Sequence, residues 1–425
     1  MTRSVNVNAI RAQAQTVVTR CCKLSTFSEE PDRTVRTFLS EPMHACHREI
    51  AGWIEPLGAE IRIDSAGNLR ALYPAAEPRA PRLLIGSHLD TVQDAGAFDG
   101  ILGVVLGAAL LESLQGERLP FAIEVVGFSE EEGVRFGTPF IGSRALVGRL
   151  DDEILCRKDA HGISVREAIE HFGLEPNKLD GERLQDEILG FVEFHIEQGP
   201  ILEELGLPLG AVDVVSGQSK LEVSFLGHAN HAGATPMHRR RDAMAGAAEW
   251  ILAVEREAQQ VPGLSATVGA VRLEPGATNV IAGAARLSLD VRHRVDDVRI
   301  GAVKHLIDLA EEIASRRGLS VGHDGSQSQP SVVMDRLLLS YVEEALRMSG
   351  CSPHRMVSGA GHDAMILAEK IPSAMIFLRT PGGISHNPRE SVKAEDIEKA
   401  IEVGLHLLDV LVSPAAVQER MIQSA

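Results

Sequence analysis

The sequence has few aromatic residues, few cysteines and fewer basic than acidic residues. Aromatic side chains make up 4% of the 425 residues, which disfavours the stacking platforms that bind single-stranded nucleic acid. The 42 Lys and Arg residues are outnumbered by 59 Asp and Glu, giving a net charge of −17. A nucleic-acid partner is therefore not expected, because such binding needs clustered basic residues. A small anionic substrate remains compatible, since one local arginine can outweigh the global charge.

A disulfide framework and a membrane span are also not expected. The cysteines are Cys21, Cys22, Cys46, Cys156 and Cys351. Their number is odd and no pair has C-x-x-C spacing, which is typical of a reduced protein. The longest apolar stretch, 101–111, is shorter than the ~18 residues that cross a bilayer. Residues 1–20 lack the apolar centre of a signal peptide. We therefore expect a cytoplasmic protein without a membrane partner.

Buried-type strands alternate with helices in the first part of the chain and again near its end. The predicted helices are 4–25, 100–114, 337–349 and 394–411, and the predicted strands are 59–64, 69–73, 82–87, 121–128 and 374–378. The run RLLIGS at 82–87 is a buried-type strand whose apolar residues are consecutive rather than alternating, as in a sheet covered on both faces. This alternation predicts an α/β fold with a mainly parallel sheet.

The segment 216–329 has a different pattern. The run KLEVSFL at 220–226 alternates polar and apolar residues, which suits a sheet with one wet face. The predicted order is strand 220–226, helix 241–259, strands 266–273 and 284–292, helix 300–317 and a last strand at 320–325. This β-α-β-β-α-β order is the ferredoxin-like arrangement. We therefore predict one α/β domain, residues 1–215 and 330–425, interrupted by a smaller α+β domain at 216–329.

Side chains that bind metal recur where predicted strands end. His88 and Asp90 follow the strand 82–87, and on extended backbone two residues this far apart point the same way. A carboxylate behind an imidazole orients a metal-bound histidine. The alternative is an ordinary surface loop.

Two acidic segments lie near that first pair in sequence. Asp99 precedes the helix at 100–114, where its alternative role is a helix N-cap. Glu130, Glu131 and Glu132 follow the strand 121–128, where the alternative is a solvated acidic turn. A metal site is the sharper hypothesis, because one of two adjacent glutamates can bind metal while the other moves a proton.

Two further histidines stand in short, defined contexts, FHIEQGP at 194–200 and GGISHNP at 382–388. With 16 histidines in the chain, either His195 or His386 alone is more often a surface residue than a ligand. The joint occurrence of three histidines and two carboxylates at such positions favours zinc, or manganese and cobalt. A carboxylate bridging two ions would hold them about 3.5–4 Å apart, as in two-metal hydrolases.

Taken in order, these motifs resemble the M20 metallopeptidase and amidohydrolase family, in its carbamoylase and allantoate amidohydrolase branch. The resemblance covers nearly the whole chain. Its motifs are GSHLDTV (86–92), AFDGILGV (97–104), EEEGVRFG (130–137), GSRALVG (142–148), FHIEQGP (194–200), GHANHAGATPM (227–237), TNVIAG (278–283), SGAGHDA (358–364) and GGISHNP (382–388).

The resemblance implies a site for two divalent metal ions per subunit. His88 and His195 would each bind one metal face, and Asp99 would bridge both ions. Glu132 and His386 would complete the shell of the second ion. The implied positioning and catalytic carboxylates are Asp90, which would orient His88, and Glu131, which would be the general base.

The resemblance also assigns function to the inserted domain, as a lid that dimerises. His231 would reach the active site, often from the partner subunit, and polarise the scissile carbonyl. Asn279 and Arg292 would hold a substrate carboxylate, for which the planar arginine fork is suited. Their alternatives are a turn residue and a solvated strand residue. Further implied pocket residues are Gln198, His228, Gly359 and His362.

His195 narrows the range of expected activities, because many M20 peptidases have an acidic metal ligand at the corresponding position. The expected enzyme is a hydrolase of non-peptide C–N bonds that cleaves a small N-carbamoyl amino acid, ureido acid or allantoate. The alternatives are an M20 aminoacylase or dipeptidase and a catalytically silent scaffold of the same fold. The basic run 238–241 maps onto no specificity and is interpreted as solvated surface.

Overall fold

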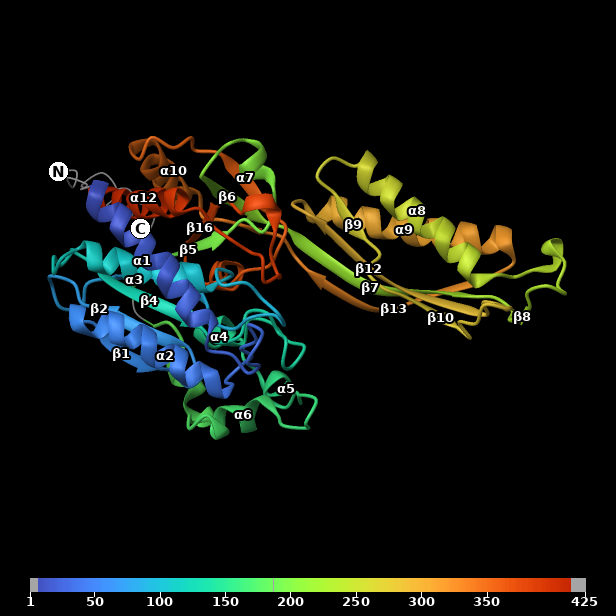
Figure 1. Ribbon diagram of the computed structural model, residues 1–425, viewed down its shortest axis with the longest axis horizontal. Coiled ribbons are helices and arrows are strands. Elements are labelled where there is room, and N and C mark those ends of the chain that lie inside the picture. Colours follow the sequence, from blue (N-terminus) through green and yellow to red (C-terminus); the bar gives the residue numbers. More distant parts are fainter. Residues whose placement is uncertain (1–6, 186, 414–425) are drawn as a thin grey trace. The chain divides into compact units, whose positions relative to one another are not determined.

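The computed structural model describes residues 7–185 and 187–413, which form two compact units (Figure 1). The first unit contains the chain up to Asp213, Met334–Met356 and the chain from His362 onward. The second contains Val214–Val333 and Val357–Gly361. The second unit is therefore an insertion in the sequence of the first.

A nine-stranded sheet forms the centre of the first unit, in the order β1-β2-β4-β3-β5-β16-β6-β14, with β15 paired to β6. The neighbours β4, β3, β5 and β16 run parallel, and antiparallel strands flank them. The strands are β1 (Glu60–Ile63), β2 (Leu69–Tyr73), β3 (Arg82–His88), β4 (Ala122–Phe128), β5 (Ile188–Ile196), β6 (Leu209–Val215), β14 (Val332–Val333), β15 (Arg355–Ser358) and β16 (Ser373–Leu378). The predicted α/β fold with a mainly parallel central sheet is confirmed.

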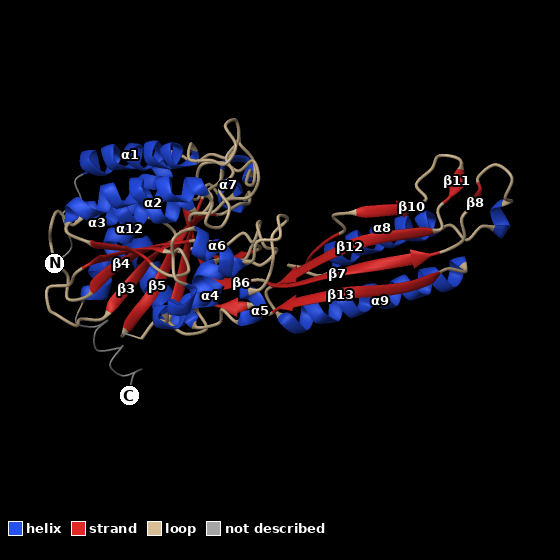
Figure 2. Cartoon of the chain, turned by 90° about the horizontal axis from the view of Figure 1, so that it is seen from below, coloured by secondary structure: helices blue, strands red, loops and turns tan. Residues whose placement is uncertain are grey.

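Helices cover this sheet on both faces, and α1, α3 and α12 pack together on one of them (Figure 2). The helices are α1 (Val7–Ser25), α2 (Glu41–Ile54), α3 (Ile101–Ser113), α4 (Ile141–Val147), α5 (Asp152–Leu155), α6 (Val165–His171), α7 (Ile201–Glu204), α10 (Arg336–Met348), α11 (Asp363–Leu367) and α12 (Ala394–Val412). All residues of α3 from Ile101 to Leu111 are buried, so the longest apolar stretch is a core helix. Within the described ranges, no helix is long and apolar enough to cross a membrane. The predicted helix 4–25 begins at Val7 here, and its residues 4–6 lie outside the described part.

His47 of α2 is a buried histidine without a hydrogen bond on either ring nitrogen. Its ring packs edge-on against Phe172, with ring centroids 5.9 Å apart. Burial, reinforced by nearby His44 and Arg36, lowers the pKa of His47 to about 3. The folded protein therefore keeps this imidazole neutral over a pH range in which the unfolded chain protonates it.

Replacing His47 by leucine is expected to make the free energy of unfolding fall less between pH 7 and pH 5. The unfolded chain binds the proton near pH 6.5 and the folded chain near pH 3, so the free energy of unfolding falls as pH drops between those values. Between pH 7 and pH 5 this one group contributes about 2 kcal/mol to that fall. Urea unfolding at both pH values checks the prediction. His161→Leu, at an exposed histidine, is the control. Equal pH dependence of H47L and the parent protein would contradict it.

The second unit is a five-stranded antiparallel sheet in the order β10-β12-β7-β13, with β9 paired to β12, and two helices on one face (Figure 1). Its elements are β7 (Gly217–Leu226), β8 (Asn230–His231), α8 (Ala243–Gln260), β9 (Ser265–Thr267), β10 (Val271–Glu274), β11 (Val280–Ile281), β12 (Ala284–His293), α9 (Asp296–Arg317) and β13 (Ser320–Gln329). Trp250 of α8 donates its indole N–H to the carbonyl of Leu306 in α9, at 2.8 Å. Apolar residues of β7 and β12 face these helices.

The structure corrects several predicted boundaries in this unit. The helix predicted from residue 300 begins at Asp296, and the strands predicted at 220–226 and 320–325 extend to Gly217 and to Gln329. The single strand expected at 266–273 is two strands, because the pairing with β12 shifts by one residue between Thr267 and Val271. The extra residue makes an irregularity around Gly269, as in a β-bulge. The helix expected from residue 241 begins at Ala243, since the carboxylate of Asp242 caps the amides of Met244 and Ala245.

Candidate metal centre

The sequence-predicted metal ligands of the first unit meet at one edge of the large sheet. His88 is the last residue of β3, and His195 is the penultimate residue of β5. Glu131 and Glu132 follow the end of β4, and His386 follows β16. Because these four strands are parallel neighbours, their carboxyl ends bring the side chains together, where open α/β sheets bind ligands.

Asp99 lies between two groups of ligand-type atoms. Its Oδ1 is 3.2 Å from His195 Nε2 and 3.8 Å from His88 Nε2. Its Oδ2 is 3.2 Å from His386 Nε2, which in turn is 3.5 Å from a carboxylate oxygen of Glu132. Two triads that could each hold a cation, His88–Asp99–His195 and Asp99–Glu132–His386, therefore share one carboxylate.

The two buried imidazoles are oriented as metal ligands are. His88 Nδ1 donates to the backbone carbonyl of Asp90 at 3.0 Å, and His195 Nδ1 donates to the carbonyl of Ile196 at 2.9 Å. With Nδ1 protonated in each ring, the Nε2 lone pairs are left free, and the two Nε2 atoms lie only 3.4 Å apart. Asp99 Oδ1, which faces them, is buried and accepts no hydrogen bond. This donor set fits a divalent cation such as zinc.

The local backbone frees Asp99 from the capping role that was its alternative. The residue before α3 is Gly100, with φ +67°, and no side chain caps the helix. A Cβ at Gly100 would lie 2.4 Å from Cε1 of His88, so only glycine fits beneath that ring. In the FDG motif, Asp99 therefore does not cap the helix, and Gly100 leaves room for the ring of His88.

Asp90 joins the histidine to the acidic turn. Its Oδ1 and Oδ2 accept hydrogen bonds from the backbone amides of Glu131 and Glu132, at 2.9 and 3.0 Å. Its Oδ1 is also 3.5 Å from His88 Nδ1, farther than the backbone carbonyl that this nitrogen contacts. The carboxylate therefore fixes the turn that carries the two glutamates at least as directly as it orients His88.

Several carboxyl groups are buried close together at this sheet edge. Burial raises the pKa of Glu131 well above its usual value, and burial with nearby Asp99 raises the pKa of Glu132 to about 7. A cation supplies the positive charge that such a group of carboxylates needs to be ionised together.

Residues outside the sequence-predicted ligands also contact Asp99, among them Ser385, whose hydroxyl donates to Asp99 Oδ2 at 3.2 Å. Predicted residue Gln198 donates from Nε2 to Asp99 Oδ2 at 3.0 Å, so the structure places it beside the ligands. Glu390, which the sequence did not single out, accepts from the amides of Phe98 and Asp99 at 2.8 and 3.0 Å. Its only sequence signal is its place four residues after His386.

His362 lies behind the histidine ligands. Its ring packs against His195, with centroids 4.5 Å apart, and its side chain is buried. Burial lowers the pKa of His362 well below its usual value, so the ring is neutral. The predicted contact of His362 with substrate stays a prediction, and the packing supports a role in placing His195.

In the second unit, His231 and Asn279 are neighbours. The short strands β8 and β11 pair antiparallel, and the amide of Ala232 donates to the carbonyl of Asn279 at 2.9 Å. Both predicted residues are exposed, as is His228 three residues before His231. The structure thus groups three predicted substrate residues in one loop region.

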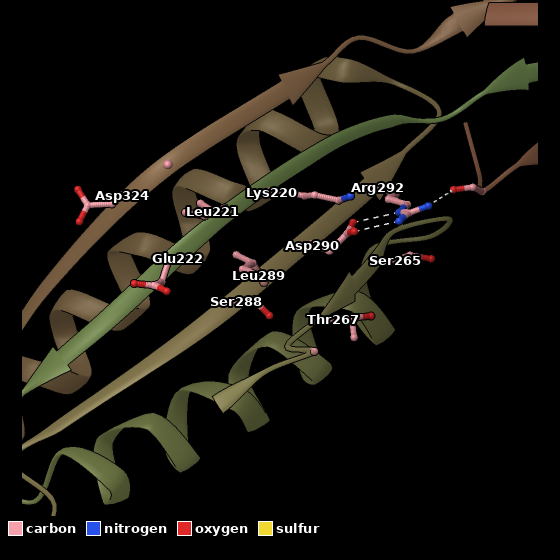
Figure 3. Close-up of a pocket in the computed structure, with 13 residues that line it drawn as sticks. Lys220, Leu221, Glu222, Ser265, Thr267, Ser288, Leu289, Asp290, Arg292 and Asp324 are labelled. Atoms are coloured by element: carbon pink, nitrogen blue, oxygen red, sulfur yellow. Dashed lines mark hydrogen bonds and ion pairs between the residues drawn. The ribbon is translucent and has the colours of Figure 1, made fainter. Parts of the chain in front are cut away.

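Arg292 is held elsewhere in the same unit, on the open face of the sheet (Figure 3). Its Nε and Nη2 form a bidentate pair with Asp290, at 3.0 and 2.9 Å, and its Nη1 donates to the carbonyl of Gly359 at 2.7 Å. Gln218 donates to Asp290 at 2.8 Å. A cavity of about 710 Å³ adjoins this network, lined by side chains that include Lys220, Ser265, Thr267 and Ser288.

His231 and Arg292 are not brought together within one chain. Asn279 precedes the first residue of β12, Ala284, whereas Arg292 is its penultimate residue. A ten-residue strand is about 30 Å long. His231 and Asn279 of one chain therefore lie at the opposite end of that strand from Arg292.

The sequence of this chain matches Peptidase family M20/M25/M40 over residues 84–410. It is 39% identical over 360 residues to N-carbamoyl-L-amino acid amidohydrolase of Geobacillus stearothermophilus, covering 84% of this chain and 88% of that protein. It is 35% identical over 430 residues to a probable allantoate deiminase of Oryza sativa subsp. japonica, covering 93% and 87%.

A solved structure shares the fold over nearly the same length. The crystal structure of an amidase of the hydantoinase/carbamoylase family from Burkholderia multivorans aligns with a TM-score of 0.87 at 32% identity, covering 94% of this chain and 98% of that one. The chain belongs to the M20/M25/M40 peptidase family. It is an enzyme, an amidohydrolase of carbon–nitrogen bonds.

Proposed function

We propose that this enzyme hydrolyses the carbamoyl or ureido C–N bond of a small carboxylate-bearing substrate, an N-carbamoyl amino acid, a ureido acid or allantoate, with two bound divalent metal ions. The observation that carries the proposal is Asp99, whose two oxygens face two separate ligand triads. His195 in the first triad agrees with the carbamoyl and ureido branch, to which the named relatives belong.

The residues that would hold the metal ions are His88, His195, Asp99, Glu132 and His386. Bound divalent ions would supply Lewis acidity, which activates a water molecule and polarises a carbonyl group. Of the two glutamates of this turn that are not proposed ligands, Glu131 is the one that lies close to His88 and Glu132, and it is the proposed base. It accepts a proton from the attacking water and passes it to the leaving nitrogen. With a carbamoyl substrate, the products are the free amine and carbamate, which decomposes to ammonia and carbon dioxide.

His231 is suited to polarise the scissile carbonyl. Its Nδ1 accepts backbone hydrogen bonds, so the neutral ring carries its proton on the exposed Nε2. That N–H donates to the carbonyl oxygen as negative charge develops on it, an interaction that strengthens in the transition state.

Arg292 and Asn279 are the proposed ligands of the substrate carboxylate, with Gln198, His228 and Gly359 as further pocket residues. Because His231 and Arg292 stand at opposite ends of β12, about 30 Å apart, one small substrate cannot contact both from the same chain. The same holds for Asn279 and His228, which lie in the loop region of His231. We therefore infer that the enzyme is a homodimer in which each site combines Arg292 and Gly359 of one subunit with the loop region of the partner subunit that carries His231, Asn279 and His228. We further propose that the second unit is a ferredoxin-like lid and dimerisation domain, and that residues 1–215 and 330–425 form the catalytic domain.

The proposed location is the cytoplasm. All five cysteines are free thiols, which agrees with a reducing compartment.

Replacing Arg292 by leucine is expected to lower kcat/KM for carboxylate substrates about 10- to 100-fold, mainly through KM. A charge-assisted hydrogen-bond pair contributes about 1.5–3 kcal/mol to binding. Steady-state kinetics of the metal-loaded enzyme checks this. Arg286→Leu is the matched control, because Arg286 lies on the same strand with a half-exposed side chain and only 3.8 Å ion pairs. An unchanged KM for R292L would exclude the carboxylate role.

A parallel assay of four substrate classes tests the proposed function. N-carbamoyl amino acids, allantoate, N-acetyl amino acids and dipeptides are offered to enzyme loaded with zinc, manganese or cobalt. The proposal expects the highest kcat/KM with a carbamoyl or ureido substrate. A preference for N-acetyl amino acids or dipeptides would establish the aminoacylase or dipeptidase alternative. A protein that binds no metal and turns over none of them would be the silent scaffold.

A further inference from the structure

The basic run His238-Arg239-Arg240-Arg241 contains one residue that differs from the others. His238, Arg239 and Arg241 are exposed, as expected of a solvated surface, whereas Arg240 is half-buried. His238 and Arg239 belong to a short 3-10 helix, Met237–Arg239, and Arg241 leads into Asp242, the N-cap of α8. Arg240 therefore stands between a rigid helix and the loop that carries His231.

The guanidinium of Arg240 bridges two backbone carbonyls of that loop. Its Nη2 donates to the carbonyl of Ala232, and its Nε donates to the carbonyl of Thr235 at 3.1 Å. The loop from 231 to 236 is otherwise closed by one backbone bond, from the amide of Thr235 to the carbonyl of His231, at 3.1 Å. The side chain thus ties together the two ends of the turn that begins at His231.

This same turn fixes the state of the His231 ring. Nδ1 accepts from the amides of Gly233 and Ala234, at 3.0 and 3.1 Å. Both amides lie between the two carbonyls that Arg240 holds. If the turn opened, these amides would leave Nδ1, and the ring would be free to rotate and to carry its proton on either nitrogen.

We propose that Arg240 is a positioning residue for His231, holding the turn that keeps the imidazole in its Nε2-protonated form with that N–H directed outward. The proposal rests on the proposed role of His231 in polarising the substrate carbonyl. The planar guanidinium suits the task because two of its N–H groups can reach two acceptors at once, which a lysine ammonium does with less geometric definition. The rest of the basic run has no such contact and no such role.

The kinetic test compares Arg240→Gln with Arg239→Gln, which removes the same charge one residue away. For R240Q we expect kcat to fall roughly 10- to 100-fold, less than the full loss of an oxyanion donor, with KM little changed. For R239Q we expect no change in either constant. If R240Q does not fold, Arg240→Lys keeps the charge and is judged by the same criteria.

A double-mutant cycle with His231→Ala separates a positioning role from general support of the fold. If Arg240 acts through His231, adding R240Q to H231A changes kcat less than twofold, because the group it positions is already absent. An equal loss in both backgrounds, or no loss in R240Q alone, would overturn the inference.

A readout that does not depend on turnover distinguishes failure of this inference from failure of the proposed function. Nitrogen NMR shifts of protein labelled with ¹⁵N-histidine report the tautomer, and the His231 signal is the one absent from H231A. We expect the Nε2-protonated form in the parent and in R239Q, and a mixture of tautomers in R240Q. An unchanged tautomer in R240Q overturns the positioning role. Full activity of H231A with an altered tautomer in R240Q overturns only the proposed role of His231.

Discussion

Replacing Glu131 by glutamine is expected to lower kcat by about 10²–10⁴, the usual contribution of a general acid–base group. The amide keeps the size of the side chain but cannot accept a proton from water. Metal content should stay at the level of the parent enzyme, because His88, Asp99 and Glu132 remain in place. Turnover and metal per chain are measured on the same preparation.

The neighbouring glutamates are matched controls for this experiment. Glu130 is fully buried and belongs to none of the candidate ion-binding groups, and burial raises its pKa well above the usual value. Glu130→Gln should therefore change turnover and metal content very little. Glu132→Gln should lose metal as well as activity. Since His88, Glu131 and Glu132 also form a group that could hold an ion, metal loss in E131Q would make Glu131 a ligand rather than the base.

Replacing Asp99 by asparagine is expected to remove most bound metal and at least as much activity as the Glu131 change. The variant loses the one carboxylate that faces both triads, and an amide oxygen is a poor substitute for a bridging ligand. Loss of an outer-shell partner alone typically weakens metal affinity 10- to 100-fold, so loss of a shared ligand should exceed that. Elemental analysis after dialysis against a chelator, with activity on re-addition of metal, measures the effect.

Asp94→Asn provides the same chemical change five residues away. Asp94 is partly exposed, has φ +57° and belongs to none of the candidate ion-binding groups, and asparagine is tolerated in that backbone conformation. It should keep metal and activity. Two retained ions in D99N would contradict the bridging role.

The sequence predicts the candidate ligands that the structure brings together, but not everything that holds them in place. His88 ends and Glu132 follows a buried, mainly apolar strand, so the rule for strand ends places them together. Strand β5, which positions His195, is not among the predicted elements, because Gly190 interrupts its apolar run. Glu390 contacts the amides of residues about 290 positions away, and no local pattern encodes such a contact.

The same limit of prediction from sequence applies to the residues of the second unit that are proposed to contact the substrate. His231, Asn279 and Arg292 are assignable from motifs, but their separation along β12 depends on how the strands align. Arg240 illustrates the limit at a single position, since a run of basic residues gives no sign of which one turns inward. A sequence pattern indicates burial and spacing. The role proposed for Arg240 depends on which backbone carbonyls its side chain reaches, and the pattern does not show this.

The contact between Gly100 and His88 has a consequence for how this gene can vary. Even alanine, the smallest replacement, would place a methyl group 2.4 Å from an imidazole that cannot shift without leaving its carbonyl partner. Every missense change at that codon therefore disturbs the same ring. Codon 100 should tolerate only synonymous changes wherever the enzyme is needed, although its product is a residue with no side chain and no chemistry of its own.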